Sequence, residues 1–299
     1  MNIIENVPNL FIIGAPKCGT TSLFHYLGEH PSIFSCPIKE PHFFNKDSKH
    51  RYYYDLDEYL ALFQSATEQQ YYRMEASVWY LYSEIAIKEI LKVSPNAKFI
   101  IMLRDPISMF LSLHQQLLYS GAEQIKNVKK AWDAQEKRRL LKEASKSDVD
   151  VTMLQYGKVL SLGNQVARVT QHLTKDQLFL IFLEDVAGNP KRVYESVLEF
   201  LGLASHSLKF KAYNTAKKRK SSVLMTATAM AVKSKEILGL KKFRFGLAKK
   251  INDWNILDID HRNQRDILEI RDYIGDYFNE DITLLETHTE KKLTHWKYL

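Results

Sequence analysis

Cysteine is scarce in this chain, and so are long apolar runs. Cys18 and Cys36 are the only two cysteines, too few for a disulfide framework, and they indicate a reducing compartment. No apolar run approaches the roughly 20 residues of a membrane-spanning helix, and the N-terminus lacks the basic and apolar regions of a signal peptide. We therefore expect a cytoplasmic protein without a membrane span.

Glycine and proline are also few. The 299 residues include 11 glycines and 8 prolines, which excludes collagen-like and largely disordered chains. With 45% hydrophobic residues the chain can bury a core of its own, and its length suits one large domain. The net charge of +7 favours anionic ligands. Charge alone does not separate a nucleotide from nucleic acid, an acidic glycan or a membrane surface.

Residues 9–27 predict a buried strand, a tight loop and the start of a helix. Positions 10–13 are apolar, as a central parallel strand requires, and Gly14 lets the backbone turn. Hydroxyl side chains follow the loop at the predicted helix N-terminus, where unpaired N–H groups and the helix dipole favour a phosphate. The candidate phosphate-binding residues are Lys17, Cys18, Gly19, Thr20, Thr21 and Ser22.

This loop differs from a Walker-A motif, GxxxxGK[ST]. The spacing from Gly14 to Gly19 matches the first half of the motif, but Thr20 stands where the motif has its lysine, and the cation is Lys17 inside the loop. A nucleoside triphosphatase needs its lysine after the second glycine to reach the phosphates, which disfavours a kinase. Two further alternatives are a turn without a ligand and a nucleophilic Cys18 with a lowered thiol pKa.

A second phosphate-binding group is predicted after the apolar strand at residues 99–103. Arg104 stands at the carboxyl end of this strand, and the Asp-Pro pair that follows is typical of a helix start. Ligands of open α/β sheets bind outside the carboxyl ends of the strands, so Arg104 and Lys17 should face one crevice. Ser112, eight residues after Arg104, can hold the same phosphate through its hydroxyl.

The segment KEPHFF, residues 39–44, places titratable side chains beside two phenylalanines. Partial burial against these rings would raise the pKa of Glu40 and make it a better general base. His42 is a neighbour able to orient it. The alternative is a solvated surface ion pair between Lys39 and Glu40.

Apolar strands and helical segments alternate along the chain. This order predicts an α/β fold, with a central parallel sheet, flanking helices and a P-loop-like phosphate-binding loop. We expect one domain over residues 1–299, with an exposed helical excursion at about 121–151 and a basic elaboration at about 209–299. Predicted strands are 10–13, 99–103 and 177–183, with 71–77 extended. Predicted helices beyond these strands include 83–93, 154–173 and 264–278.

Four consecutive cations, Lys217 to Lys220, lie among turn-forming residues. Such a run is usually solvated or binds nucleic acid. The alternative is a lid that clamps phosphates. Residues 233–250 add further cations, so an acidic polymer is a second possible ligand of this region.

Four segments, in this order, resemble the sulfotransferases that use 3′-phosphoadenosine 5′-phosphosulfate (PAPS). PKCGTTSL, residues 16–23, is similar to the loop that holds the 5′-phosphosulfate, and KEPHFF is similar to the segment with the catalytic glutamate of heparan sulfate sulfotransferases. Arg104 with Ser112 resembles the 3′-phosphate motif. NTAKKRKS, residues 214–221, is placed like the third, basic nucleotide-binding loop.

The resemblance implies a chemistry: transfer of a sulfuryl group from PAPS to a hydroxyl or amine of a small metabolite or sugar, without a metal. Glu40 would take the acceptor's proton, His42 would assist it, and Lys17 would neutralise charge on the bridging oxygen. Implied nucleotide contacts are Lys17, Cys18, Gly19, Thr20, Thr21, Ser22, Arg104, Ser112, Asn214, Lys217, Lys218 and Arg219.

Other assignments stay open from the sequence. If Glu40 is not the base, His42, Glu75 and His114 are the next candidates, in that order. A nucleotide-dependent kinase and a non-enzymatic module that binds an acidic polymer are the alternative functions. We expect no nucleic-acid partner.

Overall fold

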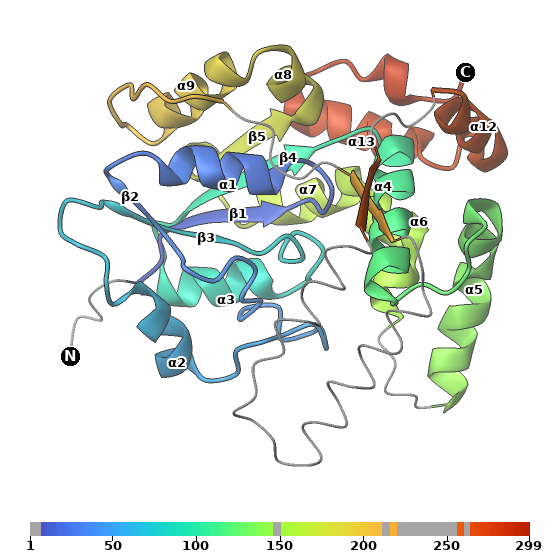
Figure 1. The fold of residues 1–299 in the computed structure, drawn as a ribbon, viewed down its shortest axis with the longest axis horizontal. Helices are drawn as coiled ribbons and strands as arrows, with labels where there is room; N and C mark the ends of the chain where they lie inside the picture. Colours follow the sequence, from blue (N-terminus) through green and yellow to red (C-terminus); the bar gives the residue numbers. More distant parts are fainter. Residues whose placement is uncertain (1–6, 146–150, 211–215, 220–255, 260–263) are drawn as a thin grey trace.

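The centre of the molecule is a parallel sheet of five strands in the order β2-β3-β1-β4-β5 (Figure 1). The computed structural model describes residues 7–145, 151–210, 216–219, 256–259 and 264–299. The strands of the sheet are β1 (Leu10–Gly14), β2 (Ile33–Ser35), β3 (Tyr72–Ala76), β4 (Lys98–Leu103) and β5 (Leu178–Phe182). The predicted α/β class with a central parallel sheet is confirmed.

Burial explains why the middle strands read as unbroken apolar runs. Every residue of β1 is buried, and so is all of β4 after its first residue, because helices cover both faces of a parallel sheet. Phe11 on β1 stacks on Phe99 of β4, with ring centroids 5.7 Å apart. Strand β2 was not predicted, because this edge strand has three residues and is only partly buried, so it carries little apolar pattern.

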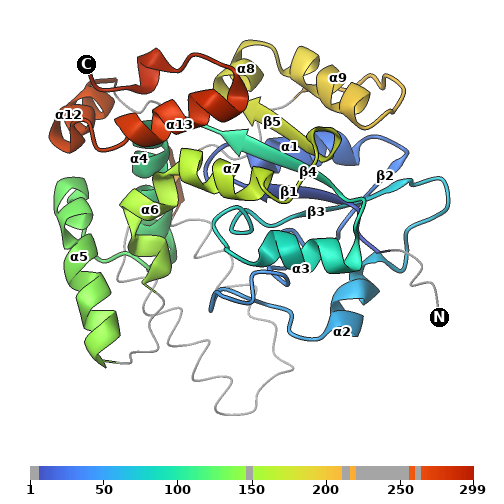
Figure 2. The same cartoon turned by 180° about the vertical axis from the view of Figure 1, so that it is seen from behind.

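Helices cover the two faces and one end of the sheet. Helix α1 lies on one face, and α3 and α7 lie on the other, as the two opposite views show (Figures 1 and 2). Helix α4 stands beyond the carboxyl ends of the strands, close to α5, α6 and α12 (Figure 1). The helices are α1 (Thr20–Gly28), α2 (Leu56–Leu60), α3 (Ala86–Val93), α4 (Pro106–Ser120), α5 (Val128–Ser145), α6 (Tyr156–Leu160), α7 (Leu162–Thr170), α8 (Leu183–Gly188), α9 (Pro190–Phe200), α12 (Gln264–Ile274) and α13 (Asn279–Thr289).

Local sequence accounts for the bounds of α4. The side chain of Asp105 accepts a hydrogen bond from the Ser108 N–H at 2.9 Å, and Pro106 is the first helical residue, where its missing N–H is harmless. The helix ends at Gly121, which adopts a left-handed φ of 83°. The predicted start of this helix is confirmed.

Two helices end earlier than their apolar periodicity predicts. The helix predicted at 154–173 is two helices, α6 and α7, separated by Ser161 with ψ 75°. The helix predicted at 264–278 ends at Ile274, because Gly275 adopts a left-handed φ of 62°. Helix α13 then follows, in a region where no helix was predicted.

The C-terminal helix α13 is joined to α7 by a buried carboxylate. Asp281 accepts hydrogen bonds from the backbone N–H groups of Gly163 and Asn164, both at 2.8 Å. These N–H groups belong to the first turn of α7, which has no partner for them within the helix. Any side chain at position 163 would begin 2.0 Å from the Asp281 carbonyl oxygen, so the close approach requires glycine.

We expect Asp281→Ala to lower the free energy of unfolding by about 1–3 kcal/mol, because it leaves buried N–H groups without acceptors. Chemical denaturation monitored by circular dichroism measures this change. Asp272→Ala on the exposed face of α12 is the matched control and should change stability by less than about 0.5 kcal/mol. Equal effects of the two substitutions would contradict a capping role for Asp281.

Candidate functional site

Three segments singled out by the sequence meet at the carboxyl edge of the sheet. They are the loop after β1, the end of β4, and residues 39–44, which run past the end of β3. Backbone hydrogen bonds join them across strand ends, so their relative positions are fixed by the sheet itself. The bonds run from Ala15 N to Met102 O (2.8 Å), from Leu81 N to Ile13 O (2.8 Å) and from Glu40 N to Ala76 O (2.9 Å).

The loop between β1 and α1 leaves a helix N-terminus without a side-chain cap. Gly19 precedes α1, and the first turn of the helix contains no acidic residue, so its N–H groups and dipole are available to an anion. Lys17 and Gly19 adopt left-handed φ angles of 65° and 87°. A Cβ at Gly19 would lie 2.7 Å from Leu183 Cδ1. Thr20 is buried, and Thr21 and Ser22 are half-buried.

Cys18 faces the core and not the crevice. Its thiol lies 3.5 Å from the Pro16 carbonyl oxygen and 3.8 Å from Met109 Sδ. Burial raises the pKa of Cys18 to about 12, because a thiolate would be desolvated there. The alternative of a nucleophilic Cys18 with a lowered pKa is therefore wrong, and only the backbone of Cys18 can serve a ligand.

Arg104 lies against this loop, and Ser112 is on the face of α4 that turns to it. Arg104 Nη1 donates a 3.0 Å hydrogen bond to the Lys17 carbonyl oxygen, so the guanidinium is held beside the loop. Ser112 is buried on α4, three residues after Met109, whose sulfur contacts Cys18. Residues three apart share a helix face, so Ser112 is on the face of α4 that turns to the loop.

The basic segment also reaches this region. Strand β6 (Ala216–Arg219) pairs in antiparallel fashion with β7 (Ile256–Ile259) and lies beside α4 (Figure 1). The backbone of Lys217, Lys218 and Arg219 is thus next to the helix that carries Ser112. Asn214 and Lys220 lie outside the described residues.

Glu40 sits in a cluster of charged groups at the start of the 39–44 segment. Its carboxylate accepts a hydrogen bond from the Lys39 ammonium, and His42 Nε2 lies 3.5 Å from Glu40 Oε2. Glu40 and His42 both adopt left-handed φ angles, of 65° and 51°. Such angles are unusual for residues other than glycine and are often found at functional sites.

The expectation that burial raises the pKa of Glu40 is wrong. Burial does act in that direction, but the interactions with His42 and Lys39 outweigh it and lower the pKa to about 2. The two phenylalanines of the segment explain the difference. Phe43 and Phe44 are buried against Tyr59, whereas the Glu40 side chain is 31% exposed and lies against Lys39 and His42.

A buried network that the sequence did not reveal holds this segment in place. The Tyr80 hydroxyl accepts hydrogen bonds from the N–H groups of Phe43 (2.9 Å) and Phe44 (3.2 Å) and donates one to Glu75 Oε2 (3.0 Å). The Tyr59 hydroxyl also donates to Glu75 Oε2, at 2.9 Å. Glu75 is fully buried on β3, and its Oε1 has no hydrogen-bond partner among the described residues. The only sequence signal for this network was one acid inside an otherwise apolar segment.

His114 and helix α5, which forms the predicted helical excursion, pack together away from Glu40. His114 is buried on α4, where its Nε2 lies 2.8 Å from the Ile125 carbonyl oxygen, and burial lowers its pKa. Helix α5 is tied to this region by Arg138, which forms a 2.7 Å ion pair with Glu123. These contacts stabilise the packing of α4 and α5, and they give His114 a structural role.

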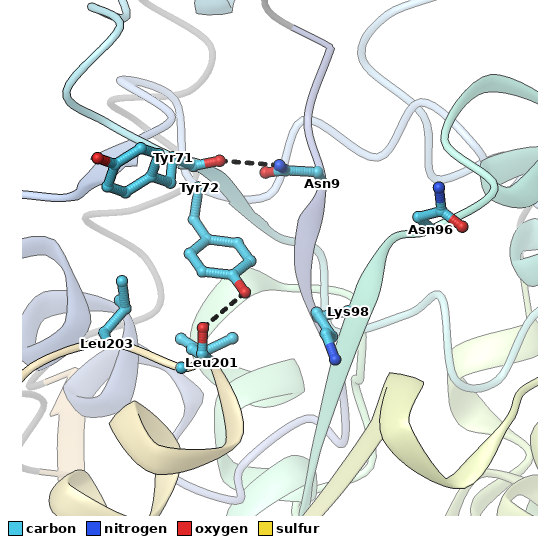
Figure 3. Close-up of a pocket in the computed structure, with 8 residues that line it drawn as sticks. Asn9, Tyr71, Tyr72, Asn96, Lys98, Leu201 and Leu203 are labelled. Carbon is cyan, nitrogen blue, oxygen red and sulfur yellow. Dashed lines mark hydrogen bonds between the residues drawn. The ribbon is translucent and has the colours of Figure 1, made fainter.

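A cavity of about 400 Å³ lies at the opposite edge of the sheet, between the amino ends of the strands and the residues after α9 (Figure 3). Two of the polar side chains drawn there are bonded to the backbone: Asn9 Nδ2 donates to the Tyr71 carbonyl oxygen, and the Tyr72 hydroxyl donates to the Leu201 carbonyl oxygen. Ligands of parallel α/β sheets bind at the carboxyl edge, so this cavity is not the candidate site.

Comparison with known proteins shows the family. A sequence model of the sulfotransferase domain matches residues 7–274, and the chain therefore belongs to this family. Human carbohydrate sulfotransferase 15 is 28% identical over 265 residues, which cover 70% of this chain and 46% of that protein. The chain spans about half the length of this curated relative.

Two further proteins are similar to this chain, one over a shorter region and one in its fold. The human bifunctional heparan sulfate N-deacetylase/N-sulfotransferase 1 is 34% identical over 118 residues, covering 37% of this chain and 13% of that protein. The crystal structure of a sulfotransferase from Alicyclobacillus acidocaldarius aligns with a TM-score of 0.68 at 23% identity and covers 97% of this chain and 98% of its own. The chain thus has the sulfotransferase fold.

The described residues contain neither a metal-binding cluster nor a membrane-spanning helix. No cluster of three or more His, Cys, Asp or Glu side chains in these parts of the chain is arranged to hold a metal ion. Among the helices described, none combines the length and the apolar character needed to cross a bilayer.

The buried carboxyl of Glu75 predicts a pH dependence of stability. Burial raises its pKa from 4.5 to about 7, so the folded protein keeps a proton that the unfolded chain releases. The folded state then loses stability as the pH rises from about 4.5 to about 7. Glu75→Gln removes this loss. We expect the stability of wild type relative to Glu75→Gln to fall between about pH 4.5 and pH 7 in urea denaturation.

Glu68→Gln, at an exposed position, is the control for this measurement and should leave the pH dependence of wild type unchanged. Parallel stability curves for wild type and Glu75→Gln over this pH range would mean that Glu75 is ionised throughout, contrary to the expectation.

Proposed function

We propose that this protein transfers a sulfuryl group from PAPS to a hydroxyl or amine of an acceptor. The observation that carries the proposal is the convergence at one sheet edge of an uncapped helix N-terminus, a guanidinium bonded to the phosphate loop, and an ionised carboxylate. Membership of the sulfotransferase family supports the chemistry. An acceptor of the carbohydrate class is supported by the names of the relatives.

PAPS would bind as a substrate along this edge. Its 5′-phosphosulfate would lie on the N–H groups and hydroxyls of residues 17–22, where the dipole of α1 favours negative charge. Its 3′-phosphate would lie between Arg104 and Ser112, with Lys217, Lys218, Arg219 and Asn214 as further donors. The fixed charges and dipoles of the chain would then hold the nucleotide without a metal.

Sulfuryl transfer would proceed as an in-line displacement, in which positioning and charge stabilisation supply most of the rate. Lys17 would neutralise the charge that develops on the bridging oxygen as the bis-phosphate nucleotide leaves. Glu40 would accept the proton of the attacking hydroxyl or amine. With a pKa of about 2, its carboxylate is already ionised, and Lys39 and His42 keep it so.

A kinase is the second candidate function, and the geometry disfavours it. The acid that follows β4 is Asp105, in the place where a kinase of this fold would hold magnesium. Its carboxylate instead caps α4 and forms a 2.9 Å ion pair with Arg271. The loop itself has Thr20 after Gly19 and no lysine there.

The first test concerns the nucleotide. We expect 3′-phosphoadenosine 5′-phosphate to bind in the presence of EDTA, and Arg104→Ala to weaken this binding by about 10- to 100-fold, because a charge-assisted contact to phosphate is lost. Isothermal titration calorimetry measures both. AMP, which lacks the 3′-phosphate, should bind wild type and Arg104→Ala equally.

Arg192→Ala, at an exposed position on α9, is the control and should bind both nucleotides like wild type. If Arg104→Ala weakens the binding of AMP as much as the binding of the bis-phosphate nucleotide, Arg104 stabilises the loop and does not contact a 3′-phosphate. Binding that EDTA abolishes would favour the kinase.

The second test concerns the base. Glu40→Gln keeps the size of the side chain and removes its basicity, so kcat should fall by about 10²-fold or more, with nucleotide affinity unchanged. The wild-type rate should show no acidic limb from Glu40 until the pH approaches its pKa of about 2. Steady-state rates of sulfate transfer across pH check both points.

Glu89→Gln is the matched control, because Glu89 also pairs with lysines, Lys46 and Lys92, but lies on α3. It should turn over at the wild-type rate. If Glu40→Gln turned over at the wild-type rate, Glu40 would not be the base, and His42 would be the next candidate.

A further inference from the structure

The backbone at the proposed base has a conformation that its own sequence disfavours. Glu40 adopts a φ of 65° although it precedes Pro41, and a residue before proline is normally extended. His42 adopts a φ of 51°. Since neither residue is glycine, both conformations cost free energy and persist only where the surrounding structure enforces them. The groups that enforce them therefore set the position of the Glu40 carboxylate.

The end of β3 and the residues after it supply these groups, because they accept the N–H groups of the segment in turn. Glu40 N donates to the carbonyl oxygen of the last residue of β3 at 2.9 Å, and His42 N donates to Ser77 Oγ at 3.1 Å. The proline between them has no N–H. The next two N–H groups both donate to the Tyr80 hydroxyl, at 2.9 and 3.2 Å. Each N–H of the segment up to residue 44 is therefore bonded.

Tyr80 can accept two N–H groups because its own proton is used elsewhere. A hydroxyl has one proton to donate and two lone pairs that accept. The Tyr80 proton goes to Glu75 Oε2, at 3.0 Å. Both side chains are fully buried, so bulk water cannot replace a bond that is lost. Glu75 thus orients the hydroxyl whose lone pairs hold the segment.

Tyr59 offers a comparison within the same network. Its hydroxyl donates to the same oxygen, Glu75 Oε2, at 2.9 Å, and its side chain is as fully buried as that of Tyr80. The N–H groups of residues 42–44 donate to Ser77 and Tyr80 instead. The two tyrosines share the bond to Glu75, and Tyr80 extends it to the segment.

We propose that Glu75 is a positioning residue of the transfer, acting through the Tyr80 hydroxyl to hold the Glu40 carboxylate where the proton of an acceptor can reach it. The proposal rests on the proposed function, in which Glu40 is the base. Because Glu75 is fully buried, it does not take that proton itself. A displacement of about 1 Å at a reacting group can slow a reaction about 10²-fold, so the network acts on kcat.

The first comparison is between the two tyrosines. Tyr80→Phe removes the hydroxyl and keeps the ring, and we expect kcat to fall by about 10- to 100-fold with the acceptor KM within about threefold, since the base acts in the transition state. Tyr59→Phe removes the other hydroxyl bonded to Glu75 and should keep kcat within about threefold. The assay uses labelled PAPS with N-deacetylated heparosan, chondroitin and 4-nitrophenol, and compares rates for the one that wild type uses fastest.

Two substitutions of Glu75 separate its hydrogen bonds from its charge. Burial raises the pKa of Glu75 to about 7, so at about pH 6 the carboxyl is mostly protonated. Glu75→Gln is then a neutral mimic that still accepts both hydroxyls, and it should retain kcat within about threefold. Glu75→Met is similar in size and lacks the acceptor, so kcat should fall by about 10- to 100-fold. Because Glu75 acts through Tyr80, the Glu75→Met/Tyr80→Phe variant should be no slower than the slower single variant.

Hydrogen exchange measured by mass spectrometry gives a readout that needs no acceptor. The N–H groups of residues 43 and 44 should exchange faster than in wild type in Tyr80→Phe and Glu75→Met, and at the wild-type rate in Tyr59→Phe and Glu75→Gln. All variants should bind 3′-phosphoadenosine 5′-phosphate like wild type, because β4 and Arg104 hold the loop after β1.

Three results would overturn the proposal. Equal losses of kcat in Tyr80→Phe and Tyr59→Phe would mean that the network supports the fold and not the base. Additive losses in Glu75→Met and Tyr80→Phe would mean that Glu75 acts by another route. Unchanged exchange at residues 43 and 44 in Tyr80→Phe would contradict the connection itself.

The design also covers a variant that does not fold and a failure of the proposed function. If Glu75→Met does not fold, the two tyrosine variants and the retained kcat of Glu75→Gln decide. Failure of wild type to bind the bis-phosphate nucleotide or to transfer sulfate would contradict the proposed function, and the exchange rates would still test the connection from Glu75 to the segment.

Discussion

The pairing of β1 with a parallel neighbour on each side is the constraint on which the site depends. Strand β1 pairs with β3 on one side and with β4 on the other. Phe11 of β1 lies opposite Glu75 of β3 and opposite Phe99 of β4. Parallel pairing brings the carboxyl ends of all three strands to one edge. Everything proposed for the donor and the base follows from this: the loop after β1, Arg104 after β4 and Glu40 beside the end of β3 become neighbours although they are far apart in sequence.

Polar groups buried behind this edge give the site its rigidity. The Tyr80 hydroxyl accepts hydrogen bonds from the backbone N–H groups of Phe43 and Phe44 and donates one to the Glu75 carboxyl. It therefore connects the segment after Glu40 to β3. Arg104 holds the loop after β1 through one hydrogen bond to the Lys17 carbonyl oxygen. Groups that are fixed before a substrate arrives need little reorganisation during a reaction, which is the condition for electrostatic catalysis. In the proposed reaction, the hydrogen bonds that stabilise this edge would also hold the reacting groups in place.

The sequence by itself determined the fold class, the strands β1, β4 and β5 of the parallel sheet, the extended segment that forms β3, and the turn from β1 into α1, because apolar runs, a glycine turn and a helix N-terminus are local signals. It did not determine β2, whose three partly buried residues carry no clear pattern, or the breaks at Ser161 and Gly275. The tertiary structure alone decided the electrostatics. Lys39 and His42 lower the pKa of Glu40, and burial raises the pKa values of Cys18 and Glu75. Lys39 and His42 are near Glu40 in sequence, but the backbone conformation that brings their side chains to its carboxylate, and the residues that bury Cys18 and Glu75, are decided only by the tertiary structure.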